Sequence, residues 1–195
     1  HLGFYDVIQT LSSWIDKFAV SVFLAASMSA VYFNGTQNVP FLPLILSAAG
    51  SAVLIQMTKV KALDEKESLL LLMKHSSRYL SCIVFPVFFF LIFFRYELFR
   101  VFFPGYRASV PVFLVSLFIL PFRAYNYTTI FQKLHKGHIS NIGALGELVA
   151  AIALMYPLYL WLGLPGLALS FIISSCMQWV YYTYHISRLL QAPAY

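Results

Sequence analysis

The stretch YLSCIVFPVFFFLIFF, residues 79–94, contains no charged residue and indicates the class of fold. The chain as a whole is similar, with 61% hydrophobic and 10% charged residues, whereas soluble domains are about one quarter charged. Lipid cannot satisfy backbone N–H and C=O groups, so only helices or a closed barrel can cross a bilayer. The stretch lacks the apolar and polar alternation of a barrel strand. The sequence therefore predicts an all-α integral membrane protein.

Further apolar segments predict a bundle of about six transmembrane helices. A span needs roughly 20 helical residues, and four segments meet this requirement: 78–98, 109–132, 139–162 and 165–189. Residues 4–57 are long enough for two more spans, and two positions are open for the turn between them. The turn lies either near 25–30 or in the polar string NGTQNVP, residues 34–40. Residues 1–195 are interpreted as a single transmembrane lobe.

Charged residues concentrate in segment 59–78, which reads KVKALDEKESLLLLMKHSSR. We interpret it as a charged cytoplasmic connector. Its leucine cluster at 69–73 leaves open a helix at the membrane interface or a charged extension of a span.

Lysine and arginine residues near the ends of the predicted spans indicate an orientation. Eight fall on one side: Lys59, Lys61, Lys66, Lys74, Arg78, Lys133, Lys136 and Arg188. Three fall on the other: Arg95, Arg100 and Arg107. Cytoplasmic loops carry the excess of positive residues, so the first side is predicted to be cytoplasmic. By the number of spans, both ends of the chain lie there too.

Charged side chains inside the predicted spans are candidates for function, because ionisable groups at bilayer depth are costly and tend to face the bundle interior. Asp16 and Lys17 are adjacent and point about 100° apart on a helix. Either both extend towards the headgroups, or Asp16 is an ion-coupling or proton site. Glu147 could pair with Arg123 on a neighbouring helix, which would neutralise two buried charges.

Arg123 is the central candidate for substrate binding. It begins the run RAYNYT, residues 123–128, which is too polar to face lipid. The arginine fork matches the oxygens of phosphate or pyrophosphate bidentately. If the first turn is the earlier one, Asn34 and Gln37 lie on a helix that faces the same cavity.

Other chemistry is not predicted. The net charge of +6 arises from short segments between apolar runs, a pattern of membrane topology rather than of nucleic-acid binding. Cys82 and Cys176 lie in apolar runs and are interpreted as buried small hydrophobic residues. His135 and His138 stand beside lysines in a short turn, where a solvated loop is a better interpretation than a metal site. We find no catalytic constellation and expect no cofactor, so we do not expect an enzyme.

The order of the segments resembles a known family. The segments that carry the resemblance are IDKFAVSVFL, AVYFNGTQNVPFLPLIL, KESLLLLMKHSSRYLSCIVFPV, YELFRVFFPGYRASVPVFLV, LPFRAYNYTTIFQKLHKG and GLPGLALSFIIS. In this order they resemble the carboxyl-terminal half of a polysaccharide flippase of the multidrug/oligosaccharidyl-lipid/polysaccharide exporter superfamily. One departure is QMTKV, residues 56–60, where many relatives carry a proline.

The resemblance implies a two-lobed exporter in the cytoplasmic (inner) membrane with about twelve or more spans. This chain would contain roughly spans seven to twelve. The amino-terminal lobe would be missing from the chain. Similar proteins move an undecaprenyl-pyrophosphate-linked oligosaccharide between leaflets by alternating access. The resemblance places Asp16 and Lys17 near the outer end of their span and Arg123 in the cavity, and it favours the earlier turn.

The leading hypothesis is a flippase for a lipid-linked glycan, such as an O-antigen or polysaccharide precursor. Arg123 would meet the pyrophosphate, and Asn34, Gln37, Tyr125 and Asn126 would meet sugars. The expected partners are the bilayer, the glycan and the missing lobe, and not nucleic acid. One alternative is a multidrug or toxin cation antiporter of the same superfamily, which would use cavity carboxylates. Another is a membrane-embedded glycan-modifying enzyme, although the predicted outer loops are short.

Overall fold

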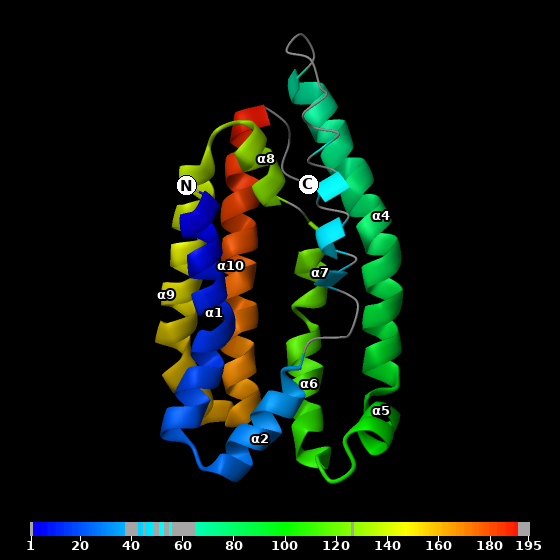
Figure 1. Cartoon of the computed structure of the whole chain (residues 1–195), viewed down its shortest axis with the longest axis vertical. Helices are drawn as coiled ribbons and strands as arrows, with labels where there is room; N and C mark the ends of the chain where they lie inside the picture. The colour runs from blue at the N-terminus through cyan, green and yellow to red at the C-terminus, as the bar shows by residue number, and fades with distance from the viewer. Residues whose placement is uncertain are drawn as a thin grey trace.

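The computed structural model describes residues 2–37, 43–44, 46–48, 51–52, 55, 65–125 and 127–190. Throughout these ranges the chain is helical apart from short turns, and they contain no strand. The long helices run roughly parallel to the longest axis of the molecule (Figure 1). The prediction of an all-α fold is confirmed for this part of the chain.

The helices form two groups that lie side by side (Figure 1). The first group contains α1 (Leu2–Phe23), α8 (Tyr127–Lys133), α9 (Gly137–Leu162) and α10 (Leu164–Leu190). The second contains α4 (Glu65–Phe93), α5 (Arg95–Phe102), the 3-10 helix η2 (Arg107–Ser109), α6 (Val110–Leu117) and α7 (Leu120–Arg123). The short helix α2 (Ala26–Gly35) joins the groups, because it packs against both α1 and α6.

Three helices are long and apolar enough to cross a membrane: Glu67–Phe93, Gly137–Leu162 and Leu164–Leu190. A fourth span results if Arg107–Leu117 and Leu120–Lys133, which meet at a bend of 41°, are taken together. α1 carries Asp6, Asp16 and Lys17 and is not among these spans. The described residues therefore support a membrane protein, and they do not reach the predicted number of six spans.

The outer surface of the long helices matches a lipid environment. Large apolar side chains stand exposed along them, including Phe89 on α4 at 51% and Val149 on α9 at 59%. In water such surface would favour association, whereas lipid tails solvate it. Cys82 and Cys176 are also exposed on this surface, so the prediction that they are buried is wrong. A small apolar side chain has no need of burial where the solvent is hydrocarbon.

The first half of α4 covers the later part of segment 59–78. Residues 65–78 are helical and continue directly into the span, as in the alternative of a charged extension, whereas residues 59–64 lie outside the described residues. Leu69 is fully buried in an apolar cluster with Ile130, Phe131 and Leu190. This helical part therefore packs against the bundle through Leu69.

The other end of α4 differs from the prediction, because the helix stops at Phe93 before residue 98. The guanidinium of Arg95 donates a hydrogen bond to the carbonyl of Ile92. A side chain that satisfies one of the last carbonyls stabilises a helix end. The chain turns at Phe94 and continues as α5.

The turn after α1 lies at Leu24 and Ala25, so the earlier of the two predicted positions is confirmed. Ala25 is extended, with φ −63° and ψ 148°, which ends the helical geometry. The hydroxyl of Ser29 donates to the carbonyl of Val20 at 3.2 Å and ties the start of α2 to the end of α1.

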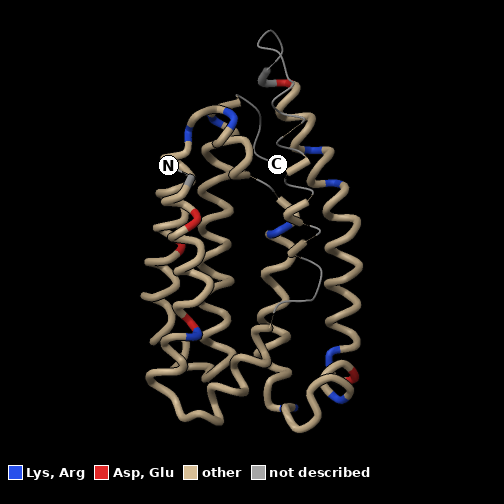
Figure 2. The backbone as a smooth tube through the Cα atoms, viewed as in Figure 1, with Lys and Arg blue, Asp and Glu red and all other residues tan. Residues whose placement is uncertain are grey.

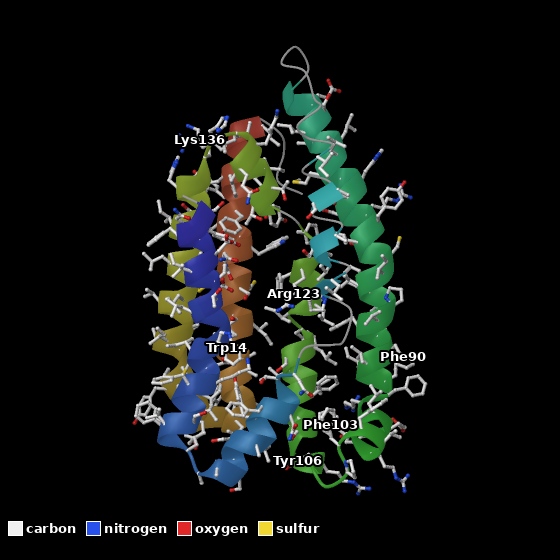
Figure 3. All side chains as sticks on the ribbon, in the orientation of Figure 1. Trp14, Phe90, Phe103, Tyr106, Arg123 and Lys136 are labelled. Carbon is white, nitrogen blue, oxygen red and sulfur yellow. The ribbon has the colours of Figure 1, made fainter. Side chains whose placement is uncertain are left out.

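Basic residues lie at both ends of the bundle (Figure 2). The turn from α8 to α9, with Lys133 and Lys136, lies at the end where α1 begins and α10 finishes (Figures 1 and 3). α5, with Arg95 and Arg100, lies at the opposite end (Figure 1). Lys133 and Lys136 are thus separated from Arg95 and Arg100 by the length of the bundle.

The hairpin of α9 and α10 is closely packed around Gly166. A Cβ atom at this position would stand 2.0 Å from the carbonyl oxygen of Leu158. Gly163, at the turn, has φ +67°, a conformation that side chains disfavour. Further along, the hydroxyl of Tyr182 donates to the carbonyl of Ser140 at 2.9 Å. These contacts fix how α10 lies against α9.

We expect Gly166→Ala to destabilise the protein by about 1–3 kcal/mol, as overpacking in cores does. The added methyl group meets backbone, which cannot rotate away as a side chain would. Thermal unfolding in lipid nanodiscs measures the effect, at roughly 2–4 °C of Tm per kcal/mol. Gly146→Ala is the matched control, because a Cβ there meets nothing within 4 Å. Equal melting temperatures for the two variants would contradict the packing described for this hairpin.

Candidate functional site

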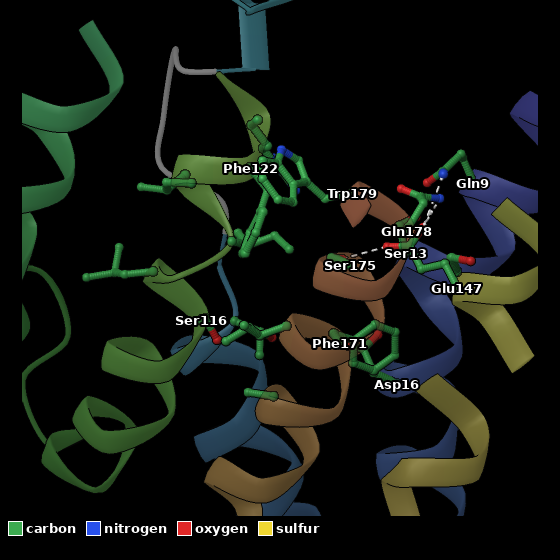
Figure 4. A pocket seen from close by; sticks show the side chains of 18 of the residues that line it. Gln9, Ser13, Asp16, Ser116, Phe122, Glu147, Phe171, Ser175, Gln178 and Trp179 are labelled. Carbon is green, nitrogen blue, oxygen red and sulfur yellow. Dashed lines mark hydrogen bonds between the residues drawn. The ribbon is translucent and has the colours of Figure 1, made fainter. Parts of the chain in front are cut away.

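A cavity of about 400 Å³ lies between the two groups of helices, midway along α10. Its lining comes from α1, α2, α6, α7, α8, α9 and α10 (Figure 4). Along α10 it is flanked by apolar clusters, one around Leu167 and the other around Ile186. A polar cavity near the middle of spanning helices is a common position for a transport site.

Arg123 lies on the cavity wall at the end of α7. α7 has only four residues and begins with Leu120 and Pro121. Proline favours the first turn of a helix, and the bend before α7 separates it from α6. The guanidinium lies centrally between the two groups of helices (Figure 3). Within the part of the chain that the structure describes, it makes no hydrogen bond or ion pair.

Asp16 and Lys17 line the cavity from the side of α1. Asp16 is only 7% exposed, and its Oδ2 accepts a hydrogen bond from the Tyr32 hydroxyl at 3.0 Å. Nζ of Lys17 lies 3.8 Å from Oδ1 of Asp16 and donates to the carbonyl of Ser13 at 3.1 Å. The two residues therefore form an ion pair in the cavity wall rather than extending to the headgroups.

Glu147 on α9 is surrounded by hydrogen-bond donors. Oε1 accepts from the hydroxyl of Ser175 at 2.6 Å, and Oε2 accepts from the amide of Gln178 at 2.7 Å and from that of Gln9 at 3.3 Å. Neutral donors from α1 and α10 therefore satisfy this carboxylate.

The predicted pair of Glu147 with Arg123 is not formed, although both side chains line the cavity. Figure 4 shows the reason: Ser175 projects from α10 towards Glu147, whereas Trp179 projects towards Phe122 on α7. α10 therefore lies between the carboxylate and the helix that carries the arginine.

The remaining predicted residues divide into three cases. Tyr125 and Gln37 line the cavity. Asn126 lies outside the described residues. Asn34 does not line the cavity. Tyr32 on α2 and Thr36, which follows the last residue of this helix, do line it. A residue halfway between two positions four apart points to the opposite side of a helix.

An aromatic group surrounds Tyr125, which the sequence analysis singled out, whereas its members Phe122 on α7, Tyr127 on α8 and Trp179 on α10 were missed. The rings of Tyr125 and Tyr127 are stacked, with centroids 5.7 Å apart and planes 7° apart. The ring of Trp179 meets Tyr125 edge to face at 6.0 Å and 69°, and Phe122 at 6.3 Å and 64°. The spacing of Ser175, Gln178 and Trp179 within an apolar helix was the available signal, because polar and aromatic residues at such intervals point towards the bundle interior.

Metal binding finds little support in this cavity. Among the described residues there is no group of three or more His, Cys, Asp or Glu side chains that could hold a metal ion. Asp16 and Glu147 are each held by separate protein donors.

We expect Tyr32→Phe to destabilise the protein by about 1–3 kcal/mol, because a buried carboxylate loses a hydrogen bond. Thermal unfolding in nanodiscs is the measurement. Tyr79→Phe is the control, because this ring stands exposed on α4. In the background of Asp16→Asn the cost of Tyr32→Phe should shrink. An unchanged cost in that background would show that the hydroxyl acts on some other group.

No family model, no curated protein and no solved structure matches the chain. The resemblance to polysaccharide flippases therefore stays a prediction from the sequence. The function has to be argued from the chemistry of the cavity.

Proposed function

We propose that the chain is one lobe of a membrane transporter that flips a lipid-linked oligosaccharide, with Arg123 as the ligand of the pyrophosphate. One observation carries the proposal. In the described part of the cavity, the guanidinium of Arg123 has no protein partner, whereas each of the two carboxylates does.

The charges of the cavity favour an anionic substrate. Asp16 is balanced by Lys17 and receives a hydrogen bond from Tyr32. Glu147 receives three hydrogen bonds. An unpaired guanidinium is unfavourable at bilayer depth, and an anion that binds it would lower this cost. Pyrophosphate suits the site, because its oxygens match the arginine fork bidentately.

The rest of the cavity suits the polar end of a lipid-linked glycan. The hydroxyl of Tyr125 and the amide of Gln37 line it and have no hydrogen-bond partner among the described residues. They are available to sugar hydroxyls. A volume of about 400 Å³ suits a headgroup with its first sugar, and the polyprenyl chain would remain in the lipid outside.

Transport would proceed by alternating access, in which this lobe and a second one rock about the cavity. On this proposal the lobe has six spans, one of them formed by the bent pair of α6 with α7 and α8. The end of the bundle with the larger basic group faces the cytoplasm, so α1 begins and α10 finishes there. The membrane would be the cytoplasmic membrane.

A cation antiporter is the second candidate, because Asp16 and Glu147 both line the cavity. A cationic drug would have to displace Lys17 from Asp16, or several donors from Glu147. Substrate charge therefore distinguishes the two functions.

We expect Arg123→Ala to weaken the binding of polyprenyl pyrophosphate about 10- to 100-fold, the loss of a charged hydrogen-bonded contact. The affinity of Arg123→Lys should lie between those of the wild type and Arg123→Ala, because lysine keeps the charge and loses the bidentate fork of arginine. Binding to the full-length protein in nanodiscs, together with glycan export in cells, measures the effect. Arg100→Ala is the control, because Arg100 is an exposed arginine on α5.

Wild-type binding and export by Arg123→Ala would contradict the proposal. Binding of a cationic drug that is lost in Glu147→Gln and retained in Arg123→Ala would favour the antiporter instead.

A further inference from the structure

The aromatic group beside Arg123 forms a corner on one side of the cavity. Tyr125 and Trp179 both line the cavity, and their ring planes meet at 69°. Tyr127 stacks on Tyr125, and its hydroxyl accepts a hydrogen bond from Thr183 at 3.3 Å. Tyr125 itself remains 38% exposed. Tyr125 in this corner is therefore held in place by Tyr127 and remains accessible from the cavity.

The other side of the cavity has a different chemistry. Gln9, Ser13 and Asp16 of α1 line it, and Gln9 and Asp16 are engaged with Glu147 and Tyr32. A pyranose ring has an apolar face of C–H groups and a rim of hydroxyls. It packs its C–H face on an aromatic ring, as apolar surfaces do, while its hydroxyls reach nearby polar groups. Tyr5, Tyr32 and Phe171 also line the cavity, and the corner of Tyr125 and Trp179 is the aromatic surface that lies beside Arg123.

The corner lies close to Arg123, the residue proposed to bind the pyrophosphate. Arg123 is two residues before Tyr125, and its neighbour Phe122 contacts the ring of Trp179. In a lipid-linked glycan the first sugar is bonded directly to the pyrophosphate. A ligand whose pyrophosphate binds Arg123 therefore has its first sugar within reach of the aromatic rings.

We infer that the corner of Tyr125 and Trp179 is the binding site for the first sugar of the lipid-linked glycan, so that these two rings contribute to the choice of that sugar. This inference rests on the proposed function and adds to it a sugar-binding site that is separate from Arg123, the residue that binds the pyrophosphate. Trp179 would contact the sugar and not the pyrophosphate.

The test compares two probes on the full-length protein in nanodiscs. One is polyprenyl pyrophosphate that carries a single N-acetylhexosamine, and the other is the same lipid without sugar. Trp179→Ala should weaken binding of the sugar-bearing probe about 5- to 10-fold, a loss typical of one aromatic contact. It should leave the sugar-free probe unchanged. Trp161→Ala is the control, because Trp161 is exposed at the outside end of α9.

Tryptophan fluorescence gives a second readout that does not need the alanine variant to fold. The sugar-bearing probe should change the emission of the wild-type protein, and Trp179→Phe should abolish this change. The sugar-free probe should have little effect on emission.

Three results would overturn the inference. In the first, Trp179→Ala weakens the binding of both probes equally. In the second, the sugar-bearing and the sugar-free probe change the emission of Trp179 by the same amount. In either case the proposed function stands if Arg123→Ala still weakens the sugar-free probe. In the third, Arg123→Ala binds the sugar-free probe as tightly as the wild type does. The proposed function then fails, and the inference fails with it.

Discussion

The absence of water from the hydrocarbon core of a bilayer is the constraint on which this structure depends. A polar group between the spanning helices gains stability from a partner inside the protein, because lipid offers none. Asp16 finds Tyr32 and Lys17, and Glu147 finds Ser175 with Gln178 and Gln9. Arg123 finds none within the described residues. On the proposed function, this cation without a protein partner is the feature that relates the fold to an anionic substrate.

The central helix α10 organises both sides of the cavity. One face carries Ser175 and Gln178 towards Glu147, and the neighbouring face carries Trp179 towards α7 (Figure 4). Ser170 and Ser174 are fully buried and donate to carbonyls of their own helix. These small residues let neighbouring helices approach closely, as is typical of membrane bundles. The position of α10 thus separates the region around the carboxylates from the region around the arginine.

The sequence predicted those features that depend on one helix at a time. The limits of the spans near 139–162 and 165–189 agree closely with α9 and α10, because Gly163 interrupts an otherwise apolar run. Arg123 was placed in a cavity because a charge beside polar neighbours cannot face lipid. Features that depend on pairs of helices were missed. The partner of Glu147 and the aromatic corner are set by how α10 lies between α7 and α9, which hydropathy does not encode. The rotation of α2, which turns Tyr32 and not Asn34 towards the cavity, could not be predicted from the polar string alone.

Cysteine labelling of the protein in nanodiscs tests the central claim, that a polar cavity lies inside a lipid-embedded bundle. Ser116→Cys lines the cavity, whereas Phe89→Cys and Val149→Cys lie on the outer surface; each is introduced after Cys82 and Cys176 are replaced by alanine. A charged methanethiosulfonate reagent reacts only with thiols in water. The structure predicts rapid labelling of Ser116→Cys and little or none at the two outer positions. Labelling of Phe89→Cys and Val149→Cys as fast as Ser116→Cys would contradict it.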